Sequence, residues 1–285
     1  MKRIRRGWAL TKKSWALLSS HRDLVRFPLY GGIATIVLGL VFLGPGAFAL
    51  DRHTYGLGVP LVVIGIYVLS VVGVYFSVGL AACADRIFRG ESATVADGIA
   101  VANSRFGAIC GWAALSTAIA VLVGALENQG GALGDIAGRL VGAAWSLVTF
   151  LAVPVIAIEG TGPLETLKRS ASLFRERWGQ QITGNIAIGG VVFLLGFLPG
   201  IALIVIGIVI WASVGFLGAL LVVVGALAIC VAILVSKALS GIFGVALYRY
   251  ALDGEVSGGF TQEDLESAIR PKGGRRLGGA SPGTV

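Results

Sequence analysis

Six long apolar stretches follow one another along the chain, separated by short polar connections. Each is long enough, at about 1.5 Å per helical residue, to cross a hydrocarbon core about 30 Å thick. Charged residues make up only 13% of the 285 residues, well below the share of about 25% in soluble domains. The sequence therefore predicts an all-α polytopic membrane protein with six transmembrane helices. The predicted spans are Phe27–Leu50, Leu57–Ala84, Gly107–Leu126, Arg139–Ile158, Thr183–Ala212 and Leu217–Leu239, the last continuing to Leu252.

The lysines and arginines are distributed unevenly between the two sides of the predicted spans. Only Arg52 and Arg139 lie in the odd-numbered connections, whereas all the others except Lys237 lie at the termini or in the even-numbered connections. By the positive-inside rule, this predicts a multi-pass protein of the cell membrane with both termini in the cytoplasm. The net charge of +8 then indicates a basic cytoplasmic face that contacts the anionic headgroups of the lipid bilayer. It does not indicate nucleic-acid binding, which would require a soluble basic fold.

A unit recurs along the chain, in which an amphipathic segment precedes a pair of apolar stretches. This repeat predicts three transmembrane hairpins with amphipathic helices in the cytoplasmic interface. The amphipathic helices are expected at residues 8–25, 95–106 and 163–178, with a shorter one at 262–270. The chain then divides into a basic amphipathic helix (1–26), a transmembrane domain (27–252) and a cytoplasmic C-terminal segment that ends in a disordered tail (253–285).

Two of the amphipathic helices carry start signals. Thr94 is followed three residues later by Asp97, the pattern of a capping box, and Pro163 suits a first helical turn, where its missing N–H costs nothing. We expect these helices to pack under the bundle and to hold the cytoplasmic ends of the second and sixth spans. Glycines spaced four apart from Gly130 to Gly142 predict close helix packing, either within the chain or with a homo-oligomer or membrane-protein partner.

Two kinds of feature could mark a site at membrane depth. Pro45 interrupts the first predicted span, and Pro199 with Gly200 interrupts the fifth; paired breaks of this kind form substrate sites in transporters, although near a membrane boundary they simply end a helix. Lys237 is the one cation deep in an apolar stretch, which suggests either function or a side chain that reaches the cytoplasmic boundary. The polar candidates at the cytoplasmic helix ends are Asn185 and Glu159, and Glu159 or Asp85 could pair with Lys237.

Sequence patterns of known catalytic or metal sites are missing from the predicted helices of the chain. It contains no G-x-x-x-x-G-K-[ST], H-E-x-x-H or C-x-x-C pattern, and a G-x-S-x-G match occurs only at residues 279–283, in the predicted disordered tail. Its three cysteines are scattered through apolar stretches, which does not suit a disulfide or metal framework. We therefore expect no catalytic residues, no metal and no cofactor.

Short motifs spread over most of the chain resemble those of a prokaryotic family of six-span membrane proteins of unknown function. The residues that carry the resemblance are Phe27-Pro28, Gly111-Trp112-Ala113, Pro154, Glu159-Gly160, Gly162-Pro163, Lys168-Arg169-Ser170, Arg177-Trp178-Gly179, Pro199-Gly200, Ile242-Phe243 and Ala246 through Ala251. That family is loosely similar to the membrane domain of some glycerophosphodiester phosphodiesterases. The resemblance implies a fold and a location, and it carries no catalytic residues. The phosphodiesterase domain itself, with its acidic metal ligands, has no counterpart in this sequence.

Three functions remain open from the sequence. The first is a non-enzymatic scaffold, lipid-organising protein or accessory membrane component, because glycine-rich packing and interfacial helices need no site. The second is a small transporter or channel with a site near the Pro/Gly breaks of spans one and five. The third, with the least support, is a lipid-modifying enzyme.

Overall fold

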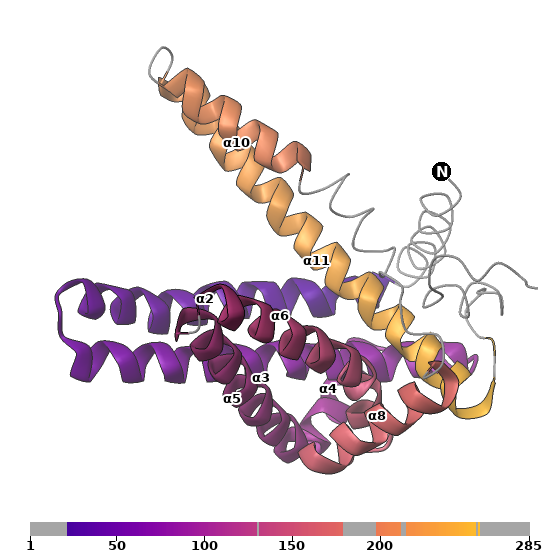
Figure 1. The fold of residues 1–285 in the computed structure, drawn as a ribbon. Helices are drawn as coiled ribbons and strands as arrows, with labels where there is room; N and C mark the ends of the chain where they lie inside the picture. The colour runs from indigo at the N-terminus through magenta and orange to yellow at the C-terminus, as the bar shows by residue number, and fades with distance from the viewer. Residues whose placement is uncertain (1–21, 130, 179–197, 212–214, 255, 257–285) are drawn as a thin grey trace, which may run out of the picture.

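A computed structural model describes residues 22–129, 131–178, 198–211, 215–254 and 256. Within these residues the chain forms nine helices and no strand (Figure 1). The predicted all-α class is therefore confirmed for the described part of the chain. The helices are α2 (Arg22–Asp51), α3 (Tyr55–Phe88), α4 (Val95–Ser104), α5 (Phe106–Gln129), α6 (Gly131–Val148), α7 (Ala152–Ile158), α8 (Pro163–Trp178), α10 (Leu198–Trp211) and α11 (Gly215–Asp253).

Four of the described helices are long and apolar enough to cross a membrane: α2, α3, α5 and α11. They correspond to the first, second, third and sixth predicted spans, and they support the assignment as a membrane protein. The helix that corresponds to the sixth span, α11, runs unbroken for 39 residues, beyond the predicted apolar stretch Leu217–Leu239. The total of six spans stays a prediction, since the fourth and fifth predicted spans are not single described helices.

The fourth predicted span, Arg139–Ile158, is interrupted in the structure and consists of parts of two helices. α6 ends at Val148, and α7 starts only after a short gap, with Pro154 in its first turn, where a missing N–H costs no helical hydrogen bond. Ser170 of α8 occupies the gap. Its buried hydroxyl donates to the Val148 carbonyl (2.6 Å) and accepts from the Leu151 N–H (3.2 Å). A side chain from another helix thus satisfies backbone groups that the gap leaves without helical partners.

The break predicted at Pro45 is wrong, because α2 continues through this proline to Asp51. The neighbouring helix α3 packs closely on both sides of it. A Cβ at Gly46 would lie 2.8 Å from the Val62 side chain, and a Cβ at Gly65 would lie 2.8 Å from Phe42. We attribute the continuity to this packing, since neighbouring helices make proline tolerable inside membrane helices.

Only the end of the fifth predicted span, Thr183–Ala212, lies in the described part of the chain. α10 begins at Leu198, so Pro199 and Gly200 lie in its first turn rather than at a break within a described helix. Asn185 lies outside the described residues, as do the predicted helix at 262–270, the C-terminal tail and most of the first amphipathic helix.

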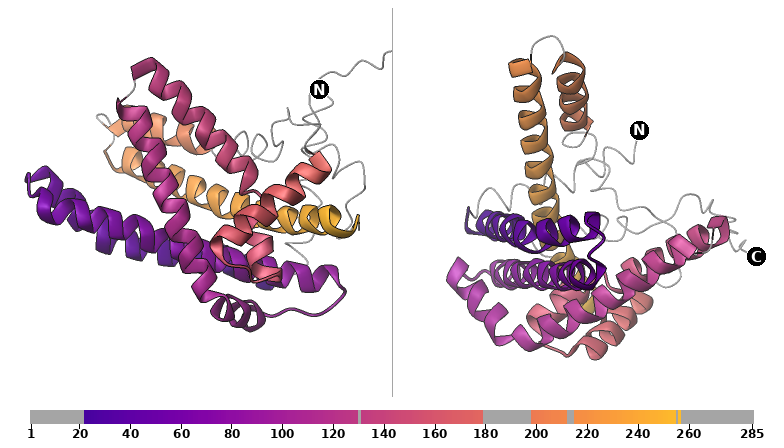
Figure 2. Two further views of the ribbon diagram at one scale, coloured as in Figure 1. Left: turned by 60° about the horizontal axis from the view of Figure 1, so that its bottom comes forward. Right: turned by 90° about the vertical axis from the view of Figure 1, so that its left-hand side faces the viewer.

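Several consecutive helices pack together, among them α2 with α3, α5 with α6, and α10 with α11. Figures 1 and 2 show the α2–α3 and α10–α11 pairs diverging from a common region, which we call the base. The base consists of α4, α7, α8 and the C-terminal ends of α3 and α11. One of the predicted glycine contacts occurs within the chain, where Gly138 of α6 packs against Glu127 of α5.

The amphipathic helices α4 and α8 bury their apolar faces in the base. Leu173 and Phe174 of α8 belong to a core formed with α7 and α11, and Ala102 of α4 belongs to one formed with α3. The contacts of α4 with α3 and of α8 with α11 agree with the prediction that these helices hold the ends of the second and sixth spans. Protein therefore covers the faces that an interfacial helix would bury in lipid.

Three helices with their C-terminal ends in the base, α3, α7 and α11, share one kind of C-terminus. Gly90 follows α3, Gly160 follows α7 and Gly254 follows α11, with φ of 79°, 71° and 72°. Glycine adopts this left-handed conformation without the penalty that a Cβ brings, and it commonly terminates helices. Gly160 has a second reason to lack a side chain, because a Cβ there would collide with the guanidinium of Arg105. The repeat predicted from the sequence thus appears as a repeated turn.

We predict that Gly98→Ala destabilises the protein, whereas Gly107→Ala does not. A Cβ at Gly98 in α4 would lie 2.6 Å from the carbonyl oxygen of Gly79 and 2.8 Å from the Cys83 sulfur, while a Cβ at Gly107 meets nothing within 4 Å. Overpacking of this kind costs about 1–3 kcal/mol. Thermal unfolding of the two variants in detergent would test this, and equal midpoints would contradict the tight seat of α4 on α3.

Candidate functional site

Two acids from different helices meet two adjacent residues of α11 in the base. Arg249 Nη1 lies 3.1 Å from the Asp85 carboxylate of α3, which also accepts from Arg89 Nη2 at 2.9 Å. The Tyr248 hydroxyl donates to Glu159, at the end of α7, over 2.6 Å. We call Asp85, Glu159, Arg169, Tyr248 and Arg249 the basal cluster.

The Glu159 carboxylate has a second partner on α8. Arg169 Nε donates to its two oxygens at 2.9 and 3.2 Å, and this contact raises the pKa of Arg169 above its ordinary value. Glu159 therefore connects α7 to α8 through a charge-assisted hydrogen bond and to α11 through Tyr248. Its side chain is 23% exposed and that of Arg169 is 38% exposed, so water screens this pair in part.

Local sequence explains how the cluster is positioned. Glu159 is the last residue before the turn at Gly160, so its side chain lies at the point where the chain turns from α7 to α8. Asp85 lies one turn before the end of α3, where Arg89 can reach it across the helix. The stretch 242–248 of α11 is buried throughout, so Tyr248 (2% exposed) meets its acid inside a packed core.

A second polar network fixes α4 beneath α3. Thr94 and Asp97 form the predicted capping box, with the Asp97 N–H donating to the Thr94 hydroxyl and the Thr94 N–H donating to the Asp97 carboxylate. Arg86 of α3 pairs with Asp97 at 2.8 Å and with Glu91 at 3.2 Å. The hydrogen bonds from Thr94, together with Arg86, lower the pKa of Asp97 to about 2.

Lys237 lies apart from both acids. It is exposed on α11, and within the described part of the chain no ion pair joins it to Glu159 or Asp85, so the pairing considered from the sequence does not occur there. It lines a groove of about 390 Å³ between α2, α3 and α11. The groove-lining residues are Pro28, Leu29, Gly31, Gly32, Ile33, Thr35, Ile36, Gly73, Phe76, Ser77, Leu80, Leu227, Cys230, Val231, Ile233, Leu234, Lys237 and Ala238.

The other candidates from the sequence do not join Lys237. Pro45 is absent from the groove lining and lies in the half of α2 that is remote from the base. Gly200 of α10 packs against α11. A Cβ at Gly200 would lie 2.5 Å from Ile229 and 3.0 Å from the Gly225 carbonyl of α11. In the described structure, Glu159 thus contacts residues of α8 and α11. Lys237, Pro45 and Gly200 lie in three separate parts of the fold.

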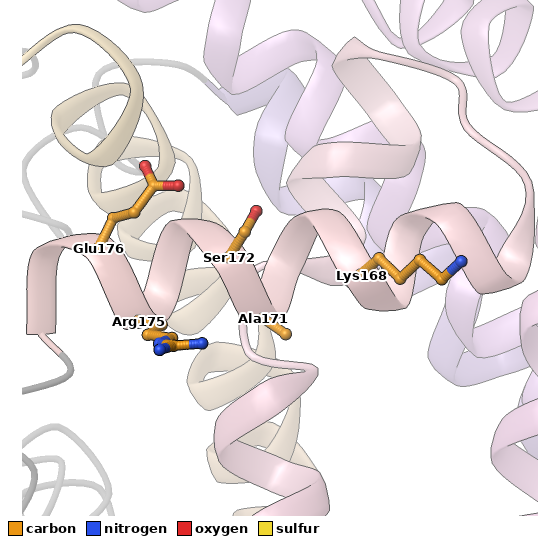
Figure 3. Close-up of a pocket in the computed structure, with 5 residues that line it drawn as sticks. All are labelled: Lys168, Ala171, Ser172, Arg175 and Glu176. Carbon is orange, nitrogen blue, oxygen red and sulfur yellow. The ribbon is translucent and has the colours of Figure 1, made fainter.

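The outer face of α8 carries cations that have no acidic partner in the described part of the chain. Lys168 and Arg175 lie seven residues apart and border a shallow hollow of about 570 Å³ with Ala171, Ser172 and Glu176 (Figure 3). Figure 3 shows Glu176 pointing to the opposite side of the helix from Arg175. Arg169, on the inner side, is the cation of α8 that pairs with Glu159.

Sequence reasoning identified the acids of the basal cluster and missed the partners from α11. Tyr248 and Arg249 lie 89 and 164 residues from Glu159 and Asp85, and no local spacing connects such positions. The available signal was the run Ala246 to Ala251, which carried part of the family resemblance. A buried Tyr-Arg pair at the end of a long apolar helix is a candidate for pairing with acids elsewhere in the fold.

We predict that Tyr248→Phe lowers the unfolding temperature more than Tyr75→Phe. Both substitutions remove one hydroxyl hydrogen bond, but Tyr248 donates to a carboxylate in a packed core, whereas Tyr75 donates to the amide of Asn103 at an exposed position (2.7 Å). A hydrogen bond to a charged group is worth about 1.5–3 kcal/mol, against about 1 kcal/mol for a neutral one. Equal shifts in a detergent unfolding assay would show that the contact with Glu159 does not hold the base.

We also predict that acid loosens α4. Because the folded-state pKa of Asp97 is about 2 and that of an unfolded aspartate is about 3.9, this carboxylate stabilises the fold above about pH 4, and its contribution is lost as the pH falls through 2. The buried Cys83 thiol under α4 reports the change. Its reaction with 4,4′-dipyridyl disulfide, relative to that of the exposed Cys230, should accelerate below pH 4. Asp97→Asn should react faster at neutral pH and lack the acid dependence; an unchanged ratio would contradict this role.

Comparison with known proteins identifies a family but assigns no activity to it. No curated protein and no solved structure matches the chain, so the similarity to the membrane domain of glycerophosphodiester phosphodiesterases stays a prediction. The resemblance to a family of unknown function is confirmed, because the model of one such family matches residues 57–259. This protein belongs to the family of unknown function DUF6159.

Proposed function

We propose that the protein is a non-enzymatic component of the cell membrane that binds anionic lipid headgroups at its cytoplasmic face. The observation that carries this proposal is the outer face of α8, where Lys168 and Arg175 are exposed and lack acidic partners in the described structure. The inner face of the same helix is buried in the base. Cations held in this way by a folded helix attract anionic lipids if the base faces the cytoplasmic leaflet.

The proposed orientation follows from the asymmetry of charge in the sequence. The base contains the connections that are rich in lysine and arginine, while Arg52 lies in the turn between α2 and α3 at their remote end. Several basal cations are neutralised by acids: Arg86, Arg89, Arg169 and Arg249 all have carboxylate partners. Lys168 and Arg175 are therefore the basal cations of the described chain best able to contact headgroups.

The two alternative functions have less support. A transporter site near the Pro/Gly breaks would need Pro45 and Gly200 near a shared cavity, yet each packs in a different helix pair. A lipid-modifying enzyme would need an acid or base available to a substrate, and the acids of the basal cluster are engaged by arginine and tyrosine. A scaffold or lipid-organising role requires neither arrangement.

We predict that the double variant Lys168→Gln/Arg175→Gln loses part of its enrichment in anionic lipid. Each cation near a membrane surface contributes about 1 kcal/mol to attraction for anionic lipid, so the two together should lower the ratio of phosphatidylglycerol to phosphatidylcholine retained in native nanodiscs. Lipid analysis by mass spectrometry measures this ratio. The wild-type enrichment should also fall at high ionic strength, because salt screens exposed charges.

The matched control is Arg52→Gln/Arg139→Gln, which removes the same formal charge away from α8, at the turn between α2 and α3 and in the middle of α6. This control should retain the wild-type lipid ratio. If both double variants lose enrichment equally, overall charge explains the effect and the role assigned to α8 is wrong. If neither changes the ratio, binding of headgroups at this helix is excluded.

A further inference from the structure

The groove between α2, α3 and α11 has glycines on two of its three helices. Gly31, Gly32 and Gly73 all line it, and a Cβ at Gly73 would meet nothing within 4 Å. At about 390 Å³, the groove lies within the range of about 300–1,000 Å³ typical of small-molecule sites. Its remaining lining is almost entirely aliphatic or aromatic, and the Ser77 hydroxyl is already engaged by the Gly73 carbonyl at 2.7 Å.

Lys237 marks the end of the groove that is nearer the base. The contact of Gly32 with Leu234 fixes the register between α2 and α11. α2 leaves the base and α11 returns to it. Lys237 is therefore about one turn closer to the base than the Gly32–Leu234 contact, near the level of Pro28. Leu227 lines the opposite end, about 15 Å away along α11 at 1.5 Å per residue.

The length of the groove corresponds to one leaflet of a bilayer. α11 rises about 33 Å from Gly215 to Lys237, close to the hydrocarbon thickness of about 30 Å. Lys237 then lies at the boundary of the membrane, where its ammonium can reach the phosphate level. The groove extends from there over about half of the core, which is the depth of a single acyl chain.

We propose that this groove binds one anionic phospholipid of the cytoplasmic leaflet. The phosphate contacts Lys237, and one acyl chain lies along Gly32 and Gly73 toward Leu227. Charge complementarity selects this occupant, because the groove offers an apolar channel with a cation at one end and no acidic side chain in its lining. The inference rests on the proposed orientation, and it adds a defined site to the diffuse attraction at α8.

The first experiment is a native mass spectrometry titration of the detergent-solubilised full chain with dioleoylphosphatidylglycerol or dioleoylphosphatidylcholine. The wild type should bind the first phosphatidylglycerol more tightly than phosphatidylcholine. Lys237→Gln should weaken the first phosphatidylglycerol about fivefold, the effect expected for one cation near a membrane surface, and leave phosphatidylcholine unchanged. Lys237→Arg should keep the preference.

A steric pair of variants tests the acyl channel separately from the charge. Gly73→Leu should fill the groove and weaken the first molecule of both lipids. Gly39→Leu is its control, since Gly39 also has nothing within 4 Å of a built Cβ but lies outside the groove lining. It should bind as the wild type does. If Lys237→Gln and Gly73→Leu both bind the first phosphatidylglycerol at wild-type strength, the proposed site is wrong.

Cys230 gives a readout that needs no groove variant. It lines the groove and is exposed, whereas Cys83 is buried. In a Cys110→Ala background, phosphatidylglycerol should slow the reaction of Cys230 with an apolar maleimide, and an unaltered rate would place the lipid elsewhere.

Loss of lipid enrichment in the α8 double variant with no effect of Lys237→Gln would overturn the groove and leave the proposed function standing. The opposite result would support the groove and remove the role of α8.

Discussion

The adjacent pair Tyr248 and Arg249 is the contact on which the arrangement of the helices depends. Neighbouring residues on a helix point about 100° apart, so one residue reaches the acid of α7 while the other reaches the acid of α3. A carboxylate with so little exposure as Asp85, at 7%, requires a charged partner in its low-dielectric surroundings. The ends of three helices are therefore fixed relative to one another at a single point of α11.

Away from this point the helix pairs have few ties to each other. α2 contacts α11 in the region of Gly32 and Leu234, and beyond it the two pairs diverge (Figure 1). The groove of about 390 Å³ lies beside the close contact of Gly32 with Leu234, between the base and the diverging ends of the two pairs. The groove next to Lys237 is therefore separate from the polar contacts that close the base. A fold tied by polar contacts at one end can admit a lipid chain without losing the contacts that define it.

Much of this architecture could be predicted from the sequence, and the failures have physical causes. Apolar length alone was sufficient for α2, α3, α5 and α11, and the capping pattern at Thr94 located α4. Proline indicated one break correctly and one wrongly, because its effect depends on neighbours: the helix is interrupted beside Pro154, where Ser170 of α8 binds the backbone, whereas α3 supports α2 across Pro45. For the site, the acids could be named, but their partners on α11 depend on tertiary packing that no local pattern encodes.

The way in which α4 and α8 use their apolar faces determines how the base can contact a membrane. An amphipathic helix that inserts its apolar face gains affinity from the apolar area it buries, in addition to electrostatic attraction to anionic lipid. In α8 most of that face is occupied by α7 and α11 through Leu173 and Phe174, which leaves mainly its charged face for the bilayer. The attraction then depends on headgroup charge and ionic strength, and not on lipid packing. The proposed selectivity for anionic lipid would therefore follow from how the base folds.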